Sequence, residues 1–195
     1  DAYDGSVDLY TWDDSDPVLK AWQSIFPGQY HPMSEISGDL MAHMRYPEGM
    51  FKVQRQLLAK YHVTSASQFF SGEDFWQTPV DPTESKSEQS RDVLQPPYYL
   101  TLQTGGSDEP VFSLTSTYIP AGSSTREILT GFLSVDSDAG RTKGVRGPDY
   151  GTIRLQELPK DSNVPGPGQA QNNFNANADV SKELNLLESG STQVE

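Results

Sequence analysis

The sequence predicts an α+β fold, with several short helices in the first half and an antiparallel β-meander in the second. Apolar residues recur at helical spacing up to residue 70, and β-rich runs separated by turn residues follow from residue 98. Helices followed by strands are typical of this class. The tail predicts an extended Pro/Gly/Asn segment and a short C-terminal helix. We expect a single domain over 1–159, and a tail over 160–195 that packs on it or is partly disordered.

The first residues predict a β-hairpin whose first strand begins before residue 1. Asp4-Gly5 favours a type I′ turn, because Asp and Gly tolerate positive φ. Residues 6–12 then alternate apolar and polar side chains, as a strand does. The chain starts at Asp1 rather than at an initiator Met, and a domain rarely starts three residues before a tight turn. We therefore expect residue 1 to be a cut within a longer protein.

A helix start follows at Asp16-Pro17. Asp is a favourable N-cap residue, and Pro is favourable at the first helical position because its missing N–H has no partner there. The apolar residues that follow share one face, and Pro27-Gly28 ends the helix. That face consists of Val18, Leu19, Trp22, Ile25 and Phe26. We expect Trp22 to lie in the core.

Three further helices are expected before residue 72. Ser37 caps a short helix that ends before Pro47, and Pro47 begins a longer one with a wide apolar stripe. Ser65 and Gln68 fit a capping box for the last helix, over residues 69–70. The stripe of the longer helix comprises Met50, Phe51, Val53, Gln54, Leu57, Leu58 and Tyr61.

Four β-rich runs in the second half predict the meander, because turn residues separate them. The third run is ambiguous, since Glu127-Ile128-Leu129 could also begin a helix. The runs are Tyr98–Leu102, Val111–Tyr118, Ile128–Val135 and Thr152–Leu158.

Other segments have the composition of loops. Residues 81–95 are polar and charged, and residues 136–149 are expected to form a long hairpin loop. Residues 160–178 hold two prolines and an Asn/Gln run, and they cannot be helical through the prolines. Apolar residues at helical spacing then predict the C-terminal helix. These are Val180, Leu184 and Leu187.

The composition limits the classes of function. The chain has 14 Lys and Arg against 27 Asp and Glu, which gives a formal net charge of −13. Phosphate binding needs a basic surface, so nucleic acid is not an expected partner. The absence of cysteine excludes disulfides, thiolate catalysis and Cys-based zinc sites. No run approaches the roughly 18 apolar residues that a membrane helix needs, so this piece is not expected to span a bilayer.

The sequence contains no motif of a known catalytic or cofactor site. The spacings of His31, His43 and His62 match no pair of metal ligands on a helix. Gly-x-Ser-x-Gly, Gly-x-Gly-x-x-Gly and Walker sequences do not occur. We predict no metal site and no cofactor, and we assign no catalytic or binding residue from motifs.

Two acidic clusters have calcium binding as an alternative interpretation. Asp13–Asp16 could supply carboxylates to a hard cation, but acids at a helix start are explained more simply as caps. Asp136–Asp138 begins like a calcium loop, but Gly140 and Arg141 stand where a third ligand and the loop glycine are required. Local backbone bonds made by turn Asp residues explain this cluster more simply. Weak calcium binding at either cluster stays open.

Aromatic residues beside acids form one candidate groove. Trp12, Trp22 and Phe75-Trp76 could line a carbohydrate or peptide site, and Glu73-Asp74 directly precede the last two. The same pattern fits a segment that packs its rings on the sheet, and core positions are the more common role. Convergence of His62, Asp74 and Trp76 on one pocket would favour a site.

Several distinctive strings occur in a fixed order along the chain. They are Arg45-Tyr46-Pro47-Glu48, Phe51-Lys52-Val53-Gln54-Arg55, Tyr61-His62, Gln95-Pro96-Pro97-Tyr98-Tyr99-Leu100, Phe112-Ser113-Leu114-Thr115-Ser116, Val164-Pro165-Gly166-Pro167-Gly168-Gln169 and Gln171-Asn172-Asn173-Phe174. Together they resemble the large soluble region of uncharacterised protein family 0182, a family of bacterial multi-pass membrane proteins. The resemblance covers essentially the whole chain.

The resemblance implies a location rather than an activity. The family has several membrane helices toward its N-terminus, followed by a large soluble region. An odd number of helices with a cytoplasmic start would place that region on the extracytoplasmic side of the cell membrane. The family has no accepted activity, so no catalytic residues are carried over. The partners that it implies are the rest of the same chain and an envelope protein or polysaccharide.

Two classes of function follow as hypotheses. We favour a non-catalytic extracytoplasmic domain of an integral membrane protein, with a structural or interaction role, because catalytic constellations are absent. The alternative is an envelope-acting, hydrolase-like enzyme with Asp74 or Glu73 beside Trp76 as acid and base, or a carbohydrate-binding module. The enzyme hypothesis predicts a cleft with two carboxylates roughly 5–10 Å apart.

Overall fold

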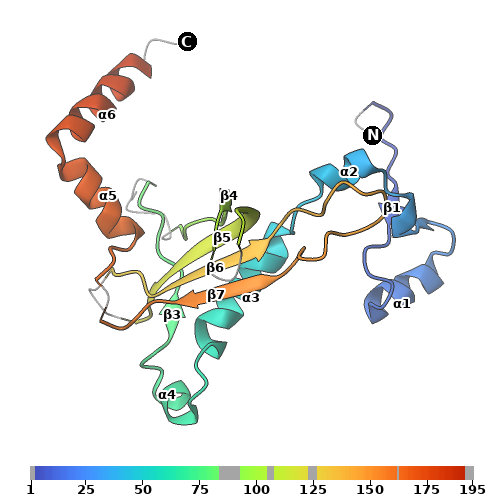
Figure 1. Cartoon of the computed structure of the whole chain (residues 1–195), viewed down its shortest axis with the longest axis horizontal. Helices are drawn as coiled ribbons and strands as arrows, with labels where there is room; N and C mark the ends of the chain where they lie inside the picture. The colour runs from blue at the N-terminus through green and yellow to red at the C-terminus, as the bar shows by residue number, and fades with distance from the viewer. Residues whose placement is uncertain (1–2, 84–92, 105–107, 123–126, 162, 192–195) are drawn as a thin grey trace. The chain divides into compact units, whose positions relative to one another are not determined.

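The computed structural model describes residues 3–83, 93–104, 108–122, 127–161 and 163–191. The chain folds as two compact units. Unit 1 comprises Asp1–Tyr46 and Asp136–Thr152, and unit 2 comprises Pro47–Val135 and Ile153–Glu195. The α+β class is confirmed, because helices predominate before residue 72 and a mostly antiparallel sheet follows them (Figure 1). The predicted domain boundary after residue 159 stays a prediction.

Unit 1 begins with a two-stranded parallel sheet. β1 (Leu9–Tyr10) pairs in parallel with β2 (Tyr30–His31), so the predicted opening hairpin is wrong. Asp4-Gly5 does form a turn, with Gly5 at a φ of 74° and the Asp4 carboxylate accepting from the Ser6 N–H. The strand that was predicted over 6–12 shortens to β1, because its partner is β2 rather than a strand across the turn.

The predicted helix starts of unit 1 are confirmed. Asp16 Oδ1 accepts from the N–H groups of Val18 and Leu19 at the start of α1 (Pro17–Ile25). Ser37 Oγ accepts from the Leu40 N–H at the start of α2 (Gly38–His43). Each cap satisfies backbone donors that have no partner within the helix. A 3-10 helix (Met33–Glu35) precedes α2.

The core of unit 1 is formed by residues from both of its stretches of chain. Ile36, Met41 and Ala139 are buried together, and partly buried rings and methionines pack against them. Ala139 belongs to the segment 136–149 that we expected to be a loop. This segment therefore contributes a buried residue to the core as well as connecting β6 to β7. The Tyr46 N–H donates to Ser137 Oγ at 2.9 Å inside the same unit. The packing side chains are Tyr10, Trp12, Met33, Met44 and Tyr150.

The apolar face of α1 takes no part in that core. Trp22 is 49% exposed, so the expectation that it lies in the core is wrong. The helix itself was predictable because its cap is local, whereas the burial of one face depends on which segments pack against it.

Unit 2 is built on a five-stranded sheet (Figure 1). The strand order is β3-β5-β6-β7, and β4 also pairs with β5. β4 and β3 both pair antiparallel with the long β5, and β7 pairs antiparallel with β6. The predicted runs are confirmed as strands, and the two-residue β3 was not predicted. The strands are β3 (Trp76–Gln77), β4 (Tyr98–Leu102), β5 (Val111–Pro120), β6 (Gly131–Asp136) and β7 (Ile153–Glu157).

Helix α3 (Glu48–Tyr61) packs on β3 and β5. Its buried residues are Phe51, Arg55 and Ala59, so the wide predicted stripe is divided between two sides of the helix. Within the stripe Phe51 is buried, Gln54 and Leu58 are half-buried, and the other four members are exposed. α4 (Ala66–Ser71) follows, but Ser65 makes no capping bond to it, so the capping box is wrong.

Arg55 is a buried cation beneath the sheet. Its side chain is 3% exposed, and Nη1 donates to the Gln95 carbonyl at 2.9 Å and to Ser116 Oγ at 3.1 Å. Burial lowers the pKa of the Arg55 guanidinium, because the charged form loses its water. These bonds tie α3 to β5 and to the segment before β4.

The tail is more helical than predicted. α5 (Pro167–Ala176) begins at the second proline, so the predicted extended segment over 160–178 is wrong for residues 167–176. Pro167 occupies the first turn, where a missing N–H breaks no helical bond. The predicted C-terminal helix is confirmed as α6 (Ala178–Ser191), which contacts α5. In the described part of the chain, no helix has the length and apolar character needed to cross a membrane.

Candidate functional site

A pocket of about 320 Å³ lies in unit 2, at the end of the sheet where β5 and β7 end and β6 begins. Phe75, Leu129 and Leu158 give it apolar walls. A smaller pocket of about 110 Å³ shares three of its charged residues and adds His62. The charged residues that line the larger pocket are Glu73, Asp74, Glu157 and Lys160.

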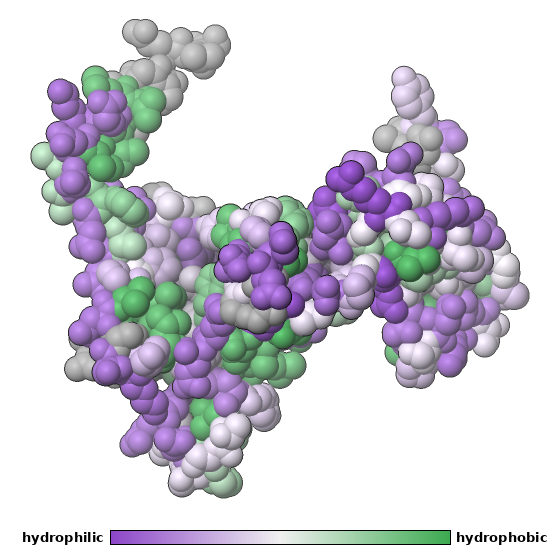
Figure 2. Space-filling model, viewed as in Figure 1, coloured by the Kyte–Doolittle hydropathy of each residue, from purple (hydrophilic) through white to green (hydrophobic). Residues whose placement is uncertain are grey.

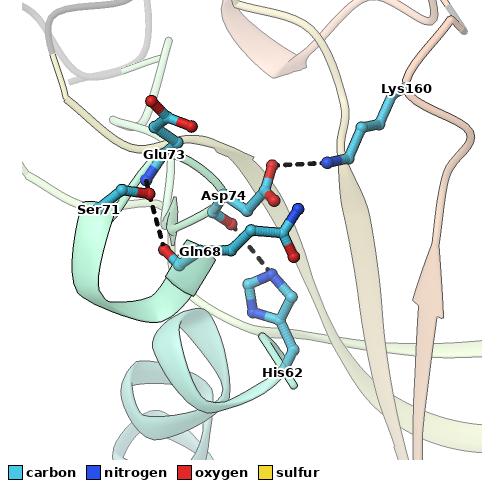
Figure 3. A network of polar contacts seen from close by, with 6 residues as sticks. All are labelled: His62, Gln68, Ser71, Glu73, Asp74 and Lys160. Carbon is cyan, nitrogen blue, oxygen red and sulfur yellow. Dashed lines mark hydrogen bonds and ion pairs between the residues drawn. The ribbon is translucent and has the colours of Figure 1, made fainter. Parts of the chain in front are cut away.

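A tight turn after α4 positions the two acids before Trp76. Gly72 ends the helix in the left-handed region, with a φ of 70°, where a side chain would be strained. Ser71 Oγ donates to the Gln68 carbonyl at 3.1 Å and accepts from the Glu73 N–H at 3.4 Å (Figure 3). The chain therefore leaves the helix with Glu73 and Asp74 at the pocket.

Asp74 forms an ion pair with Lys160. Lys160 Nζ donates to Asp74 Oδ1 at 2.7 Å, across 86 residues of sequence (Figure 3). The hydrogen bond to Asp74 raises the pKa of Lys160. The lysine side chain is 72% exposed, so water screens this pair and it adds little to stability. Its structural effect is to occupy one carboxylate oxygen of Asp74.

His62 connects the end of α3 to the same turn. Nδ1 lies 2.8 Å from the Leu58 carbonyl oxygen and Nε2 lies 3.1 Å from the Asp74 carbonyl oxygen. A neutral imidazole has one N–H and donates to one of these carbonyls, whereas the imidazolium donates to both. The ring also stacks on Trp76, with ring centroids 3.5 Å apart and planes 21° from parallel.

Trp76 is part of the core rather than an open platform. It is 8% exposed, His62 covers one side of the ring, and Tyr118 lies 5.3 Å away between centroids. A Cβ on Gly131 would come within 2.6 Å of Trp76 Cζ3, so glycine lets the indole lie against β6. Stacking of a sugar needs an exposed ring face, which Trp76 does not offer.

The structure gathers only part of the aromatic set from the sequence. Phe75 and Trp76 line the larger pocket in unit 2, whereas Trp12 and Trp22 belong to unit 1. Trp12 meets the edge of Tyr150 at 5.4 Å between ring centroids. The predicted groove thus reduces to the pocket beside Phe75 and Trp76.

Sequence reasoning found Glu73, Asp74 and His62 but missed Glu157 and Lys160. Glu157 is the last residue of β7 and Lys160 follows the strand, so both reach the pocket only through the pairing of β7 with β6. No local pattern identifies them, because an acid and a lysine near the end of a strand are common on surfaces.

No metal site emerges from the residues that the structure describes, since they contain no cluster of three His, Cys, Asp or Glu side chains. The remaining histidines have local partners. His31 Nδ1 lies 3.1 Å from Glu35 Oε2, and His43 Nδ1 lies 2.7 Å from the Asp39 carbonyl oxygen.

The two acidic clusters make local bonds. Asp13 Oδ1 accepts from the Ser15 N–H and hydroxyl at 2.9 and 2.6 Å, and Asp16 caps α1. Asp138 Oδ1 accepts from the Gly140 N–H at 2.9 Å, which confirms the turn interpretation for that residue. Asp136 is buried at the end of β6. Weak calcium binding at Asp13–Asp16 or Asp136–Asp138 stays a prediction to be tested.

The pocket combines carboxylates, one lysine and apolar walls. Glu73, Asp74 and Trp76 line it together with a third carboxylate, that of Glu157. Lys160 is already bonded to Asp74. Such a site suits a ligand with a cationic and an apolar part, and its geometry alone defines no reaction.

Comparison with known proteins identifies relatives along the whole chain. The model of the uncharacterised protein family UPF0182 matches residues 1–187. A UPF0182 protein of Bifidobacterium adolescentis is 85% identical over 195 residues, which are the whole of this chain and 18% of that protein. One of Bifidobacterium longum is 83% identical over 194 residues, and one of Paenarthrobacter aurescens is 56% identical over 196 residues. No solved structure matches.

These relatives are much longer than this chain. The chain spans 18% of the two Bifidobacterium proteins and 19% of the Paenarthrobacter protein.

Proposed function

The chain belongs to the uncharacterised protein family UPF0182, and from this premise we propose that it is a non-catalytic interaction domain of an integral membrane protein. The domain lies on the extracytoplasmic side of the cell membrane and packs against the rest of its own longer chain. An envelope protein or polysaccharide is a further partner of the assembled protein. The placement at the membrane rests on the architecture that the family resemblance implies.

One observation carries the interaction role: the outer side of α3 is apolar. Met50, Val53, Leu57 and Tyr61 are 53%, 58%, 53% and 67% exposed. Their spacing of three and four residues places them in one row along the helix. We call these four residues the α3 stripe. Other apolar residues, in green in Figure 2, lie at the surface over the sheet of unit 2.

The stripe continues into α4 through aromatic contacts. Tyr61 lies 5.6 Å from Phe69 between ring centroids, and Phe70 beside it is 90% exposed. Contiguous apolar patches of this kind are rare on proteins that act alone and usually mark a contact surface. The relatives are about five times longer than this chain, so their remaining residues are the nearest available partner.

Photo-crosslinking in the full-length protein tests the interaction role. Benzoylphenylalanine replaces Val53 or Leu57, and a matched control replaces Gln56, which is exposed on another side of the same helix. We expect crosslinks within one chain from positions 53 and 57, several-fold above those from position 56. Equal yields at the three positions, or crosslinks only between copies, would contradict the proposal.

Cysteine labelling tests the location. The chain has no cysteine, so Gln56→Cys introduces a unique thiol on an exposed helix position, once other cysteines of the full-length protein are replaced. We expect a membrane-impermeant maleimide to label it in intact cells. Labelling that requires permeabilised cells would place the domain in the cytoplasm and overturn this part of the proposal.

The alternative is a hydrolase-like enzyme that acts on an envelope substrate. The observation in its favour is that Glu73 and Asp74 line one pocket with Glu157. If the pocket is catalytic, Glu73→Gln and Asp74→Asn abolish the cellular function of the full-length protein without lowering its abundance in the membrane. Full complementation by both variants would exclude this alternative and leave the interaction role standing.

A further inference from the structure

Helix α1 presents an apolar face that the described part of unit 1 leaves open. Val18, Trp22, Ile25 and Phe26 are 62%, 49%, 61% and 41% exposed. The rings of Trp22 and Phe26 stack at 5.7 Å between centroids, with planes 11° from parallel. The two aromatic rings thus form one continuous apolar surface near the end of the helix.

By itself, α1 would be only marginally stable as a helix in water. It has nine residues, and isolated helices shorter than about 12–15 residues are marginal in water. Tertiary packing of an apolar face supplies most helical stability in proteins. Among the described residues, none of α1 is buried, and the core around Ile36 and Met41 draws no side chain from it. The apolar face therefore requires a cover that unit 1 does not supply.

The four residues have the spacing of a helix that enters a groove. They stand at positions i, i+4, i+7 and i+8, which is the spacing of anchor residues in helix-in-groove recognition. We propose that α1 is an anchor helix that inserts Trp22 and its neighbours into an apolar groove on the part of its own longer chain outside these 195 residues. This inference rests on the proposed function and adds a second, separate contact to it.

Charge around α1 argues for a protein groove rather than a lipid surface. Asp13, Asp14 and Asp16 are exposed at its start, and Lys20 is the one basic residue within it. Hydrogen bonds from Ser15 hold the pKa of Asp13 below its ordinary value, so this acid is ionised at neutral pH. Helices that bind membrane surfaces carry Lys and Arg on the polar face and are attracted by anionic lipids.

The same acids predict the charge of the partner surface around the groove. Carboxylates at the start of α1 favour basic residues on the partner surface next to that end of the helix. The relatives hold more than 80% of their residues outside the matched region, which is ample chain for such a groove. Unit 2 of this chain and a second copy of the chain are the alternatives. The experiment below distinguishes them by the crosslinked peptide, and a product on unit 2 would overturn the proposal.

The test is photo-crosslinking from α1 in the full-length protein within native membranes. Benzoylphenylalanine replaces Val18 or Ile25 on the apolar face, and Lys20 or Ser24 on the opposite side as matched controls. Mass spectrometry identifies the crosslinked peptide. We expect products within one chain, outside these 195 residues, at yields several-fold above the controls. Products with lipid, products only between copies, or yields equal to the controls would each overturn the proposal.

A substitution gives an independent readout. Trp22→Ala removes the largest anchor while Asp16 still caps the helix, so crosslinking from position 25 is expected to fall by about tenfold. Ser24→Ala, on the opposite side, is expected to leave it unchanged. An unchanged yield from position 25 in Trp22→Ala would overturn this inference. In the protein that keeps Trp22, absence of the α1 product while the products of positions 53 and 57 form would overturn this inference alone. Absence of both sets would overturn the proposed function as well.

Discussion

Tyr118 donates a hydrogen bond of 2.7 Å to the backbone carbonyl of Arg55, 63 residues earlier in the chain. The tyrosine is fully buried on β5, and the arginine is buried on α3. Burial raises the pKa of Tyr118 well above its ordinary value, and the nearby Arg55 opposes this only in part. The Tyr118 hydroxyl is therefore neutral, and its hydrogen bond connects β5 to α3.

Removal of this hydroxyl is the first prediction. Tyr118→Phe leaves the ring in place and deletes the bond to the Arg55 carbonyl, which should lower the free energy of unfolding by about 1 kcal/mol. Urea denaturation of the purified chain measures it. An unchanged midpoint would show that the hydrogen bond contributes nothing in net terms.

Alkaline pH supplies the second prediction. The pKa of Tyr118 is higher in the folded state than the ordinary value near 10 of the unfolded chain, so above pH 10 the unfolded state binds fewer protons. The contribution is fully present below pH 10, and unfolding free energy falls by up to about 1.4 kcal/mol per pH unit above it. Denaturation between pH 8 and 11 measures this slope. The slope should be smaller in Tyr118→Phe, and an equal slope would contradict the assignment.

Two glycines give a paired third prediction. Gly131→Ala places a methyl group against the Trp76 ring, where the ideal Cβ lies 2.6 Å from Cζ3, and should destabilise by about 1–3 kcal/mol. Gly49 lies in α3 with open space around its Cβ position, so Gly49→Ala should stabilise by roughly 0.5 kcal/mol. Thermal unfolding of the two variants compares them. Equal shifts in one direction would refute the close approach of Trp76 to β6.

The two sides of α3 give the fourth prediction. Phe51→Ala empties a fully buried position and should cost about 3–5 kcal/mol. Leu57→Gln changes an exposed member of the α3 stripe and should alter stability by no more than about 0.5 kcal/mol in the chain by itself. Chemical denaturation separates the two values. A large loss for Leu57→Gln would mean that the stripe is already covered within this chain.

The cap of α1 gives the fifth prediction. Asp16→Ala removes the acceptor of the Val18 and Leu19 N–H groups, so these amides should exchange faster with solvent by roughly fivefold, the equivalent of about 1 kcal/mol. Hydrogen exchange followed by NMR measures both amides. Asp16→Asn keeps an acceptor and serves as the control. Equal exchange in the two variants would argue against the cap.

Features that depend on neighbours in sequence were predictable. The caps of α1 and α2 need only Asp16 and Ser37 with the backbone that follows, and β4, β5 and β7 follow from local composition. The opening hairpin failed for the opposite reason. Asp4-Gly5 does turn, but the partner of β1 is β2, about 20 residues later, and a turn motif does not determine long-range pairing.

The features that could not be predicted depend on tertiary packing. The α3 stripe and Phe51 are equally apolar, so sequence periodicity cannot tell the side that packs on the sheet from the side that stays open. Arg55 illustrates the limit further, since a cation on the buried side contradicts any pattern based on hydropathy. In the pocket, Asp74 was identified by its aromatic neighbours, whereas Lys160 reaches it only through the folded sheet.

The division of unit 1 between two stretches of chain affects the order in which the protein can fold during synthesis. Ile36 and Met41 leave the ribosome about 100 residues before Ala139 and Ser137, which complete their surroundings. At typical translation rates of roughly 5–20 residues per second, these apolar side chains stay uncovered for about 5–20 s before Ser137 and Ala139 are synthesised. Unit 2 up to Val135 emerges within that interval. The first stretch of unit 1 is therefore accessible to chaperones and proteases until residues 136–152 have been synthesised.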